Sequence, residues 1–113
     1  MVTLDKSAAI SAEDRVLLRA VRDAVRGFLP SAMVLLYGSA ARGARAPESD
    51  YDVLILTERT LTTTEEDRIR SAVYRIEIDT GAVLSLHFWT RDEWDAHPAM
   101  PFRAEVDHDG IIL

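Results

Sequence analysis

The sequence has no cysteine, and it has no apolar run of the about 18 residues that a membrane-spanning helix needs. Without cysteine, neither disulfides nor thiolate metal sites can form. The first residues, Met1 to Lys6, also lack the basic start and apolar stretch of a secretion signal. We therefore expect a soluble, cytoplasmic protein without membrane contacts, and the composition of 48% hydrophobic and 28% charged residues agrees with a globular fold.

A surplus of basic residues is missing as well, because 19 acidic residues face 13 basic ones and give a net charge of −6. Binding along a nucleic-acid backbone needs a basic face that releases counterions, so bulk nucleic acid is excluded as a partner. A single nucleotide held through a cation remains compatible with this charge. No internal repeat is visible, and 113 residues suit one domain over 1–113, with 1–10 expected to be a loose N-terminal arm.

Helical and alternating patterns follow one another along the chain. Apolar residues at helical spacing begin after Ser11, whose side chain with Asp14 predicts a helix start, and again after Thr63, paired with Glu66. A shorter helix is expected after Thr90. Strands are expected at 33–37, 51–57, 82–89 and, as a final edge strand, 111–113. This order predicts an α/β fold with a small mixed β-sheet and helices mainly on one face.

Two carboxylates, Asp50 and Asp52, stand two residues apart at the head of the apolar run Val53 to Leu56. If that run is a strand, both side chains point to the same face. Like charges this close repel each other unless a cation lies between them. Mg²⁺ suits oxygen ligands and usually arrives with substrate phosphates, so the pair predicts a magnesium site.

Upstream, the expected strand at 33–37 runs directly into Gly38 and Ser39, and a helix-compatible stretch follows. A glycine at such a turn lets the backbone approach a ligand closely. Ser39 and the free N–H groups of a helix start can then bind phosphate oxygens. Arg42 and Arg45 add positive charge beside them.

Gly38-Ser39, ten intervening residues and then Asp50-x-Asp52 together resemble the signature of the DNA polymerase β-like nucleotidyltransferase superfamily. The resemblance is closest to the minimal nucleotidyltransferase branch, which often carries Gly-Ser-x-Ala-Arg-Gly and Ser-Asp-x-Asp. The matching positions here are Gly38, Ser39, Ala41, Arg42, Gly43, Ser49, Asp50 and Asp52.

This resemblance implies a polymerase β-like fold and transfer of a nucleoside monophosphate from ATP or another NTP to a hydroxyl. Asp50 and Asp52 would be catalytic and hold one or two Mg²⁺ ions, while Gly38, Ser39 and Arg42 would hold the nucleotide. Minimal members commonly accompany an all-helical HEPN protein as the antitoxin of a toxin–antitoxin pair, and some adenylylate a tyrosine of that partner. A HEPN-type partner and a homo- or hetero-oligomer are therefore expected.

The chain departs from the family pattern at one position. Active members usually carry a third carboxylate on the next strand, where Ser85 aligns here. Glu77 and Asp79 are expected at a helix end, too far away to substitute. Because serine is a poor metal ligand and no base, the sequence predicts slow transfer or none by the protein alone.

Other interpretations remain open. The acid pair could be a solvated strand start and Gly38-Ser39 an ordinary turn, although the spacing favours a site. A nucleotide-binding or partner-binding module that acts by stoichiometric contact is a second function, and an aminoglycoside-modifying enzyme a third, which needs more protein around its acceptor. His87 on the third expected strand could be a ligand or a base, but a packed histidine is the commoner case.

Overall fold

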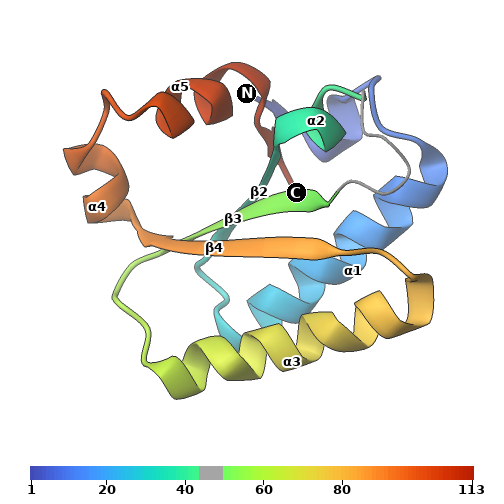
Figure 1. The fold of residues 1–113 in the computed structure, drawn as a ribbon, viewed down its shortest axis with the longest axis horizontal. Coiled ribbons are helices and arrows are strands. Elements are labelled where there is room, and N and C mark those ends of the chain that lie inside the picture. Colours follow the sequence, from blue (N-terminus) through green and yellow to red (C-terminus); the bar gives the residue numbers. More distant parts are fainter. Residues whose placement is uncertain (44–49) are drawn as a thin grey trace.

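The computed structural model describes residues 1–43 and 50–113, and Figure 1 shows that part of the chain as a twisted sheet between two layers of helices. The sheet has the strand order β1-β5-β2-β3-β4. Its strands are β1 (Val2–Thr3), β2 (Met33–Tyr37), β3 (Tyr51–Thr57), β4 (Leu84–Thr90) and β5 (Ile111–Ile112). β2 runs antiparallel to β3 and β5, whereas β4 is parallel to β3 and β1 is parallel to β5. The predicted mixed α/β sheet is thereby confirmed.

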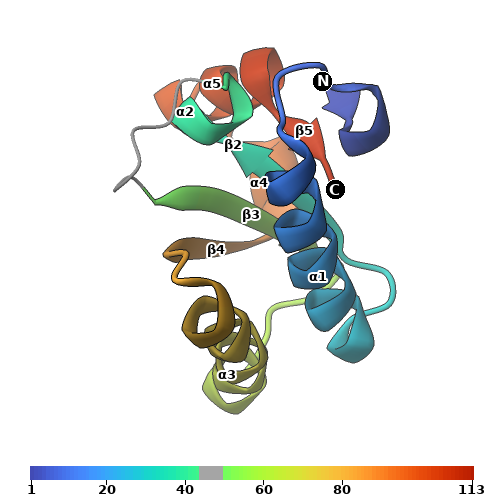
Figure 2. The same cartoon turned by 90° about the vertical axis from the view of Figure 1, so that its right-hand side faces the viewer.

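Six helical segments accompany the strands in the described chain. They are the 3-10 turn η1 (Leu4–Lys6) and the helices α1 (Ala12–Phe28), α2 (Gly38–Ala41), α3 (Thr63–Thr80), α4 (Arg91–Ala96) and α5 (Pro101–Asp109). In Figures 1 and 2 the two long helices α1 and α3 lie on one side of the sheet, and α2, α4 and α5 lie on the other.

Side-chain caps fix where α1, α3 and α4 begin. Ser11 accepts a hydrogen bond from the Asp14 N–H, as its sequence pattern predicts. At α3 the capping box is formed by Thr62 and Glu65, one residue before the predicted pair, and Thr90 with Glu93 forms another at α4. Three consecutive threonines offer the same cap chemistry, so the sequence alone does not choose among them.

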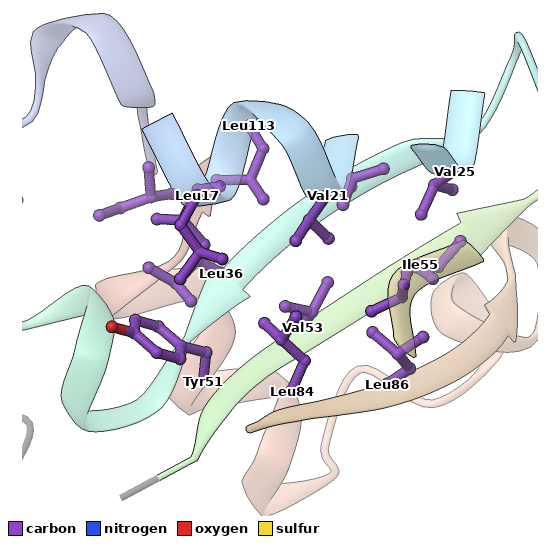
Figure 3. Packing of buried hydrophobic residues seen from close by; sticks show 14 of the residues in the cluster. Leu17, Val21, Val25, Leu36, Tyr51, Val53, Ile55, Leu84, Leu86 and Leu113 are labelled. Atoms are coloured by element: carbon purple, nitrogen blue, oxygen red, sulfur yellow. The ribbon is translucent and has the colours of Figure 1, made fainter. Parts of the chain in front are cut away.

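The main core fills the space between the sheet and the helices α1 and α3 (Figure 3). α1 contributes Leu17, Leu18, Val21 and Val25, all buried. Val16 and Phe28, which the helical spacing also placed on the buried side, are 70% and 49% exposed. From the sheet come residues that alternate along β3 and β4, namely Tyr51, Val53, Ile55, Leu84 and Leu86.

A smaller apolar cluster lies on the opposite face of the sheet, under α4 and α5. Leu35, Leu54 and Leu56 meet Trp94 and Val106 there, with Phe102 packed at the margin. Trp94 and Phe102 therefore close this second core. The short helix α2 lies on the same side of the sheet, next to β2 and β3 (Figure 1).

The first ten residues are not a loose arm, contrary to the sequence prediction. β1 pairs with β5 through Val2↔Ile111, and Leu4, Ser7 and Ile10 are buried. The Arg15 guanidinium also donates to the main-chain oxygens of Leu4 and Ser7. Short segments that pair with the far end of the chain have no local period, so the sequence pattern does not reveal them.

The last strand also lies elsewhere than predicted. β5 sits between β1 and β2, with Leu36 opposite Ile111, so it is an inner strand and not an edge. The predicted loop from Ala44 to Glu48 falls outside the described residues. No helix within 1–43 and 50–113 is long and apolar enough to cross a membrane.

Candidate active site

The turn after β2 brings the main chain against a carboxylate. Gly38 has φ +75°, in the left-handed region that favours glycine, and it begins the four-residue helix α2. A Cβ added at Gly38 would lie 2.7 Å from Oδ2 of Asp52, closer than real Cβ contacts come. The main chain at Gly38 therefore lies close to Asp52, one of the two predicted acids, whereas the approach to a ligand that the sequence suggested stays a prediction. Ser39 follows, half-buried, in α2.

The two acids stand at the start of β3. Asp50 immediately precedes the strand and is exposed, whereas Asp52 lies within it and is half-buried. Tyr37 of β2 and Ser85 of β4 are the register partners of Asp52 on its two sides. Because side chains alternate along a strand, the buried Tyr51 between the acids points to the α1 and α3 side, where its hydroxyl donates to Asp14 at 2.8 Å.

Ser85 lies beside the acid pair. Its hydroxyl donates to Oδ2 of Asp50 at 2.7 Å, which joins the start of β4 to the residue before β3. Glu77 accepts a hydrogen bond from the Leu84 N–H at 2.9 Å, and Asp79 is exposed near the end of α3. Of these three residues, only Ser85 is hydrogen-bonded to the acid pair.

The surroundings of the acid pair disfavour a negative charge on Asp52. Partial burial raises the pKa of Asp52, Asp50 and Glu105 raise it further, and His87 acts in the opposite direction. Burial, together with the negative charges of Asp52 and Glu105, raises the pKa of Tyr37 to about 12. A bound cation would relieve this concentration of negative charge.

Arg42 lies where the short helix α2 ends, and its side chain turns toward α5. Its Nη1 is 3.2 Å from Oδ2 of Asp109 and 3.6 Å from Oε1 of Glu105. The predicted phosphate-binding arginine is therefore held by two acids from the other end of the chain. Gly38, Ser39 and Arg42 do share one turn of backbone, as the motif predicted.

Two residues near the site come from sequence-distant elements. His87 is exposed on the same face of β4 as Ser85, and its ring centroid is 6.1 Å from that of Tyr37 and 6.4 Å from that of Phe102. Glu105, on α5, was missed by the sequence reasoning. Only the packing of α5 against α2 brings it here, and no local pattern in the sequence indicates that packing.

The donor set suits a hard cation that arrives with its substrate. Among residues 1–43 and 50–113, no group of three or more His, Cys, Asp or Glu side chains could hold a metal. Two carboxylates at one edge, completed by phosphate and water oxygens, are the usual way in which proteins bind Mg²⁺. Asp50 and Asp52 fit that arrangement.

The sequence and the fold were compared with known protein families, curated proteins and solved structures. A family profile described as a nucleotidyltransferase domain matches residues 18–109. A solved structure of the Cid1 poly(U) polymerase with MgGTP bound shares 16% identity at a TM-score of 0.47, covering 87% of this chain. The chain spans only 38% of that polymerase chain. No curated protein matches in sequence.

The profile match covers most of the chain, from α1 to the end of α5, and includes both halves of the Gly-Ser and Asp-x-Asp motif. The fold, with a mixed sheet that carries the two acids at the start of β3, agrees with it. The protein belongs to the nucleotidyltransferase domain family.

Proposed function

We propose that this domain transfers a nucleoside monophosphate from a magnesium-bound nucleoside triphosphate, such as ATP, to a hydroxyl group. The observation that carries the proposal is the meeting of Gly38 with Asp52 at one end of the sheet, where a Cβ at Gly38 would collide with the carboxylate. Glycine takes this left-handed conformation without strain, so the turn brings its main chain close to the carboxylate of Asp52.

In this proposal Asp50 and Asp52 hold Mg²⁺, which would neutralise charge on the reacting phosphate. Ser39 and the main-chain N–H groups of the turn hold phosphate oxygens, and the absent Cβ at Gly38 leaves the Asp52 carboxylate its place beside the turn. Arg42 binds phosphate once it leaves its acidic neighbours. The half-buried position of Asp52 favours a site in which the carboxylate is paired with a cation.

We further propose that transfer by the protein alone is slow. The hydrogen bond from the Ser85 hydroxyl to Asp50 supports this proposal, because Ser85 lies beside the acid pair, where we expect a third carboxylate to act in active members of the family. A serine there can orient Asp50, but it cannot accept the proton of an incoming hydroxyl. Loss of a general base typically costs about 10²–10⁴-fold in rate.

Transfer of label from α-³²P-labelled NTPs in the presence of Mg²⁺ tests both statements. Ser85→Asp should raise the rate, whereas Ser85→Ala should not, and Asp50→Asn or Asp52→Asn should abolish transfer. Brisk turnover by the wild type, unchanged by either Ser85 substitution, would show that the third carboxylate lies elsewhere, with Asp79 the first residue to test.

The acceptor and partner belong to the same proposal. A HEPN-type protein that is adenylylated on a tyrosine is the acceptor that the minimal branch suggests, and adding the product of the adjacent gene to the labelling reaction tests it. Label on that protein supports the antitoxin role. Without label on any partner, but with tight nucleotide binding, the protein would act as a stoichiometric module, a second function that the serine at position 85 favours.

A further inference from the structure

The contact between Arg42 and α5 places negative charge where the proposed function needs positive charge. Asp109 and Glu105 lie one helical turn apart on α5, and both approach the same atom, Nη1 of Arg42. Asp109 is only 19% exposed, and neighbouring His108 and then Arg42 lower the pKa of its carboxyl. Arg42 therefore has two acidic partners before any nucleotide arrives.

Glu105 and Asp109 are also connected, through Arg42 and Gly38, to the proposed metal ligand Asp52. Gly38 and Arg42 are joined by a backbone hydrogen bond, from the Arg42 N–H to the Gly38 oxygen at 3.3 Å. Gly38 in turn touches Asp52. The charge of Glu105 also contributes to the raised pKa of Asp52, so an acid that holds Arg42 acts electrostatically on the proposed metal site.

We propose that Glu105 and Asp109 make this site selective for metal-complexed over metal-free triphosphate. The inference rests on the proposed function of the site. The two acids hold Arg42 and set negative charge beside the phosphates, so a triphosphate must bring its own cation to bind well. Metal-free triphosphate carries more negative charge than its magnesium complex, and so it is repelled more strongly.

The experiment measures the dissociation constant of ATP, by calorimetry at low ionic strength, with Mg²⁺ and with EDTA. Glu105→Gln and Asp109→Asn are tested singly and together. Asp107→Asn is the matched control, because Asp107 is an exposed acid of the same helix whose partner is Arg103, at 3.3 Å. It removes the same charge without touching the Arg42 contact. Thermal unfolding confirms that each variant is folded.

The ratio of the two dissociation constants, EDTA over Mg²⁺, should fall about fivefold in the double variant, because metal-free ATP gains more from the lost repulsion. Asp107→Asn should leave the ratio within about twofold of the wild type. An unchanged ratio in the double variant, or an equal fall in the control, would overturn the selectivity while leaving the nucleotide site in place. Failure of the wild type to bind ATP in either condition would overturn both proposals.

Discussion

At Gly38 the main chain and the Asp52 carboxylate compete for the same space, which makes this position the sharpest residue-scale test of the site. Gly38→Ala should cost about 1–2 kcal/mol in the free energy of unfolding, because an alanine is held in the left-handed region. It should also abolish Mg-ATP binding, because the new Cβ, 2.7 Å from Oδ2, would displace Asp52. Chemical denaturation and calorimetry measure the two effects.

Gly81 provides the control. It has φ +77° at the end of α3, close to the φ of Gly38, yet a Cβ there would meet nothing within 4 Å. Gly81→Ala should therefore lose similar stability and keep nucleotide binding. If both variants bind Mg-ATP equally well, crowding of Asp52 is not what the glycine at position 38 prevents.

Asp52 itself should limit stability at neutral pH. Burial raises its pKa above the usual value of 3.8, and the charge of Asp50 adds to the shift. A raised pKa in the folded state means that the protonated form is favoured by folding, so stability is present below pH 3.8 and is lost as the pH rises through the folded-state pKa. Asp52→Asn, which has no charge, avoids this loss.

We therefore expect Asp52→Asn to unfold at the same or a higher denaturant concentration than the wild type at pH 7 without metal. The difference should shrink toward pH 4, because the wild-type carboxyl then takes up its proton. Urea titrations at both pH values make the comparison. A variant that is clearly less stable than the wild type at pH 7 would show that the Asp52 carboxylate stabilises the empty site.

At the scale of the elements, the start of α3 can be tested by mutation, because the structure assigns the cap to Thr62 whereas the sequence pattern indicated Thr63. Thr62 accepts from the Glu65 N–H at 3.2 Å, and Glu65 accepts from the Thr62 N–H at 3.0 Å. Thr62→Ala should lower the free energy of unfolding by about 1 kcal/mol, since the cap is lost. Thr63→Ala, within the same threonine run, should have little effect. Thermal unfolding measures both, and equal losses would contradict the assigned cap.

Most helices and strands could be predicted from the sequence, because helix caps, the spacing of apolar residues and glycine turns are signals that involve only a few neighbouring residues. The helix at Ser11, the strand at 33–37 and the strand at 51–57 follow from such signals. The partners of β1 and β5 did not follow, because pairing Val2 with Ile111 joins opposite ends of the chain. Periodicity also placed Val16 in the core, whereas the helix turns Leu18 inward.

The site divides in the same way. Gly38, Asp50 and Asp52 lie in one continuous motif whose chemistry can be read from spacing. Ser85 could be placed only through its strand, and its hydrogen bond to Asp50 depends on the parallel register of β3 and β4. Glu105 reaches the site through the packing of α5 on α2, for which the sequence holds no local signal.

For the whole molecule, the small size of the domain has a consequence for assembly. In the part of the chain that the structure describes, α2, α4 and α5 lie together on one side of the sheet, and no second lobe accompanies them to hold a base or an acceptor (Figure 2). We expect another subunit, either a copy or a partner, to complete the site. Analytical ultracentrifugation should show association, and a strict monomer with full activity alone would contradict this.

The central claim is that Asp50 and Asp52 bind a nucleotide through a divalent cation. Calorimetric titration of ATP into the wild type, with Mg²⁺ and with EDTA, tests it most directly, with Asp50→Asn and Asp52→Asn as matched variants. The account predicts wild-type binding that is much tighter with Mg²⁺ than with EDTA, and Mg-dependent binding that is lost in both variants. Equal affinity with and without Mg²⁺, or full Mg-dependent binding by the variants, would contradict it.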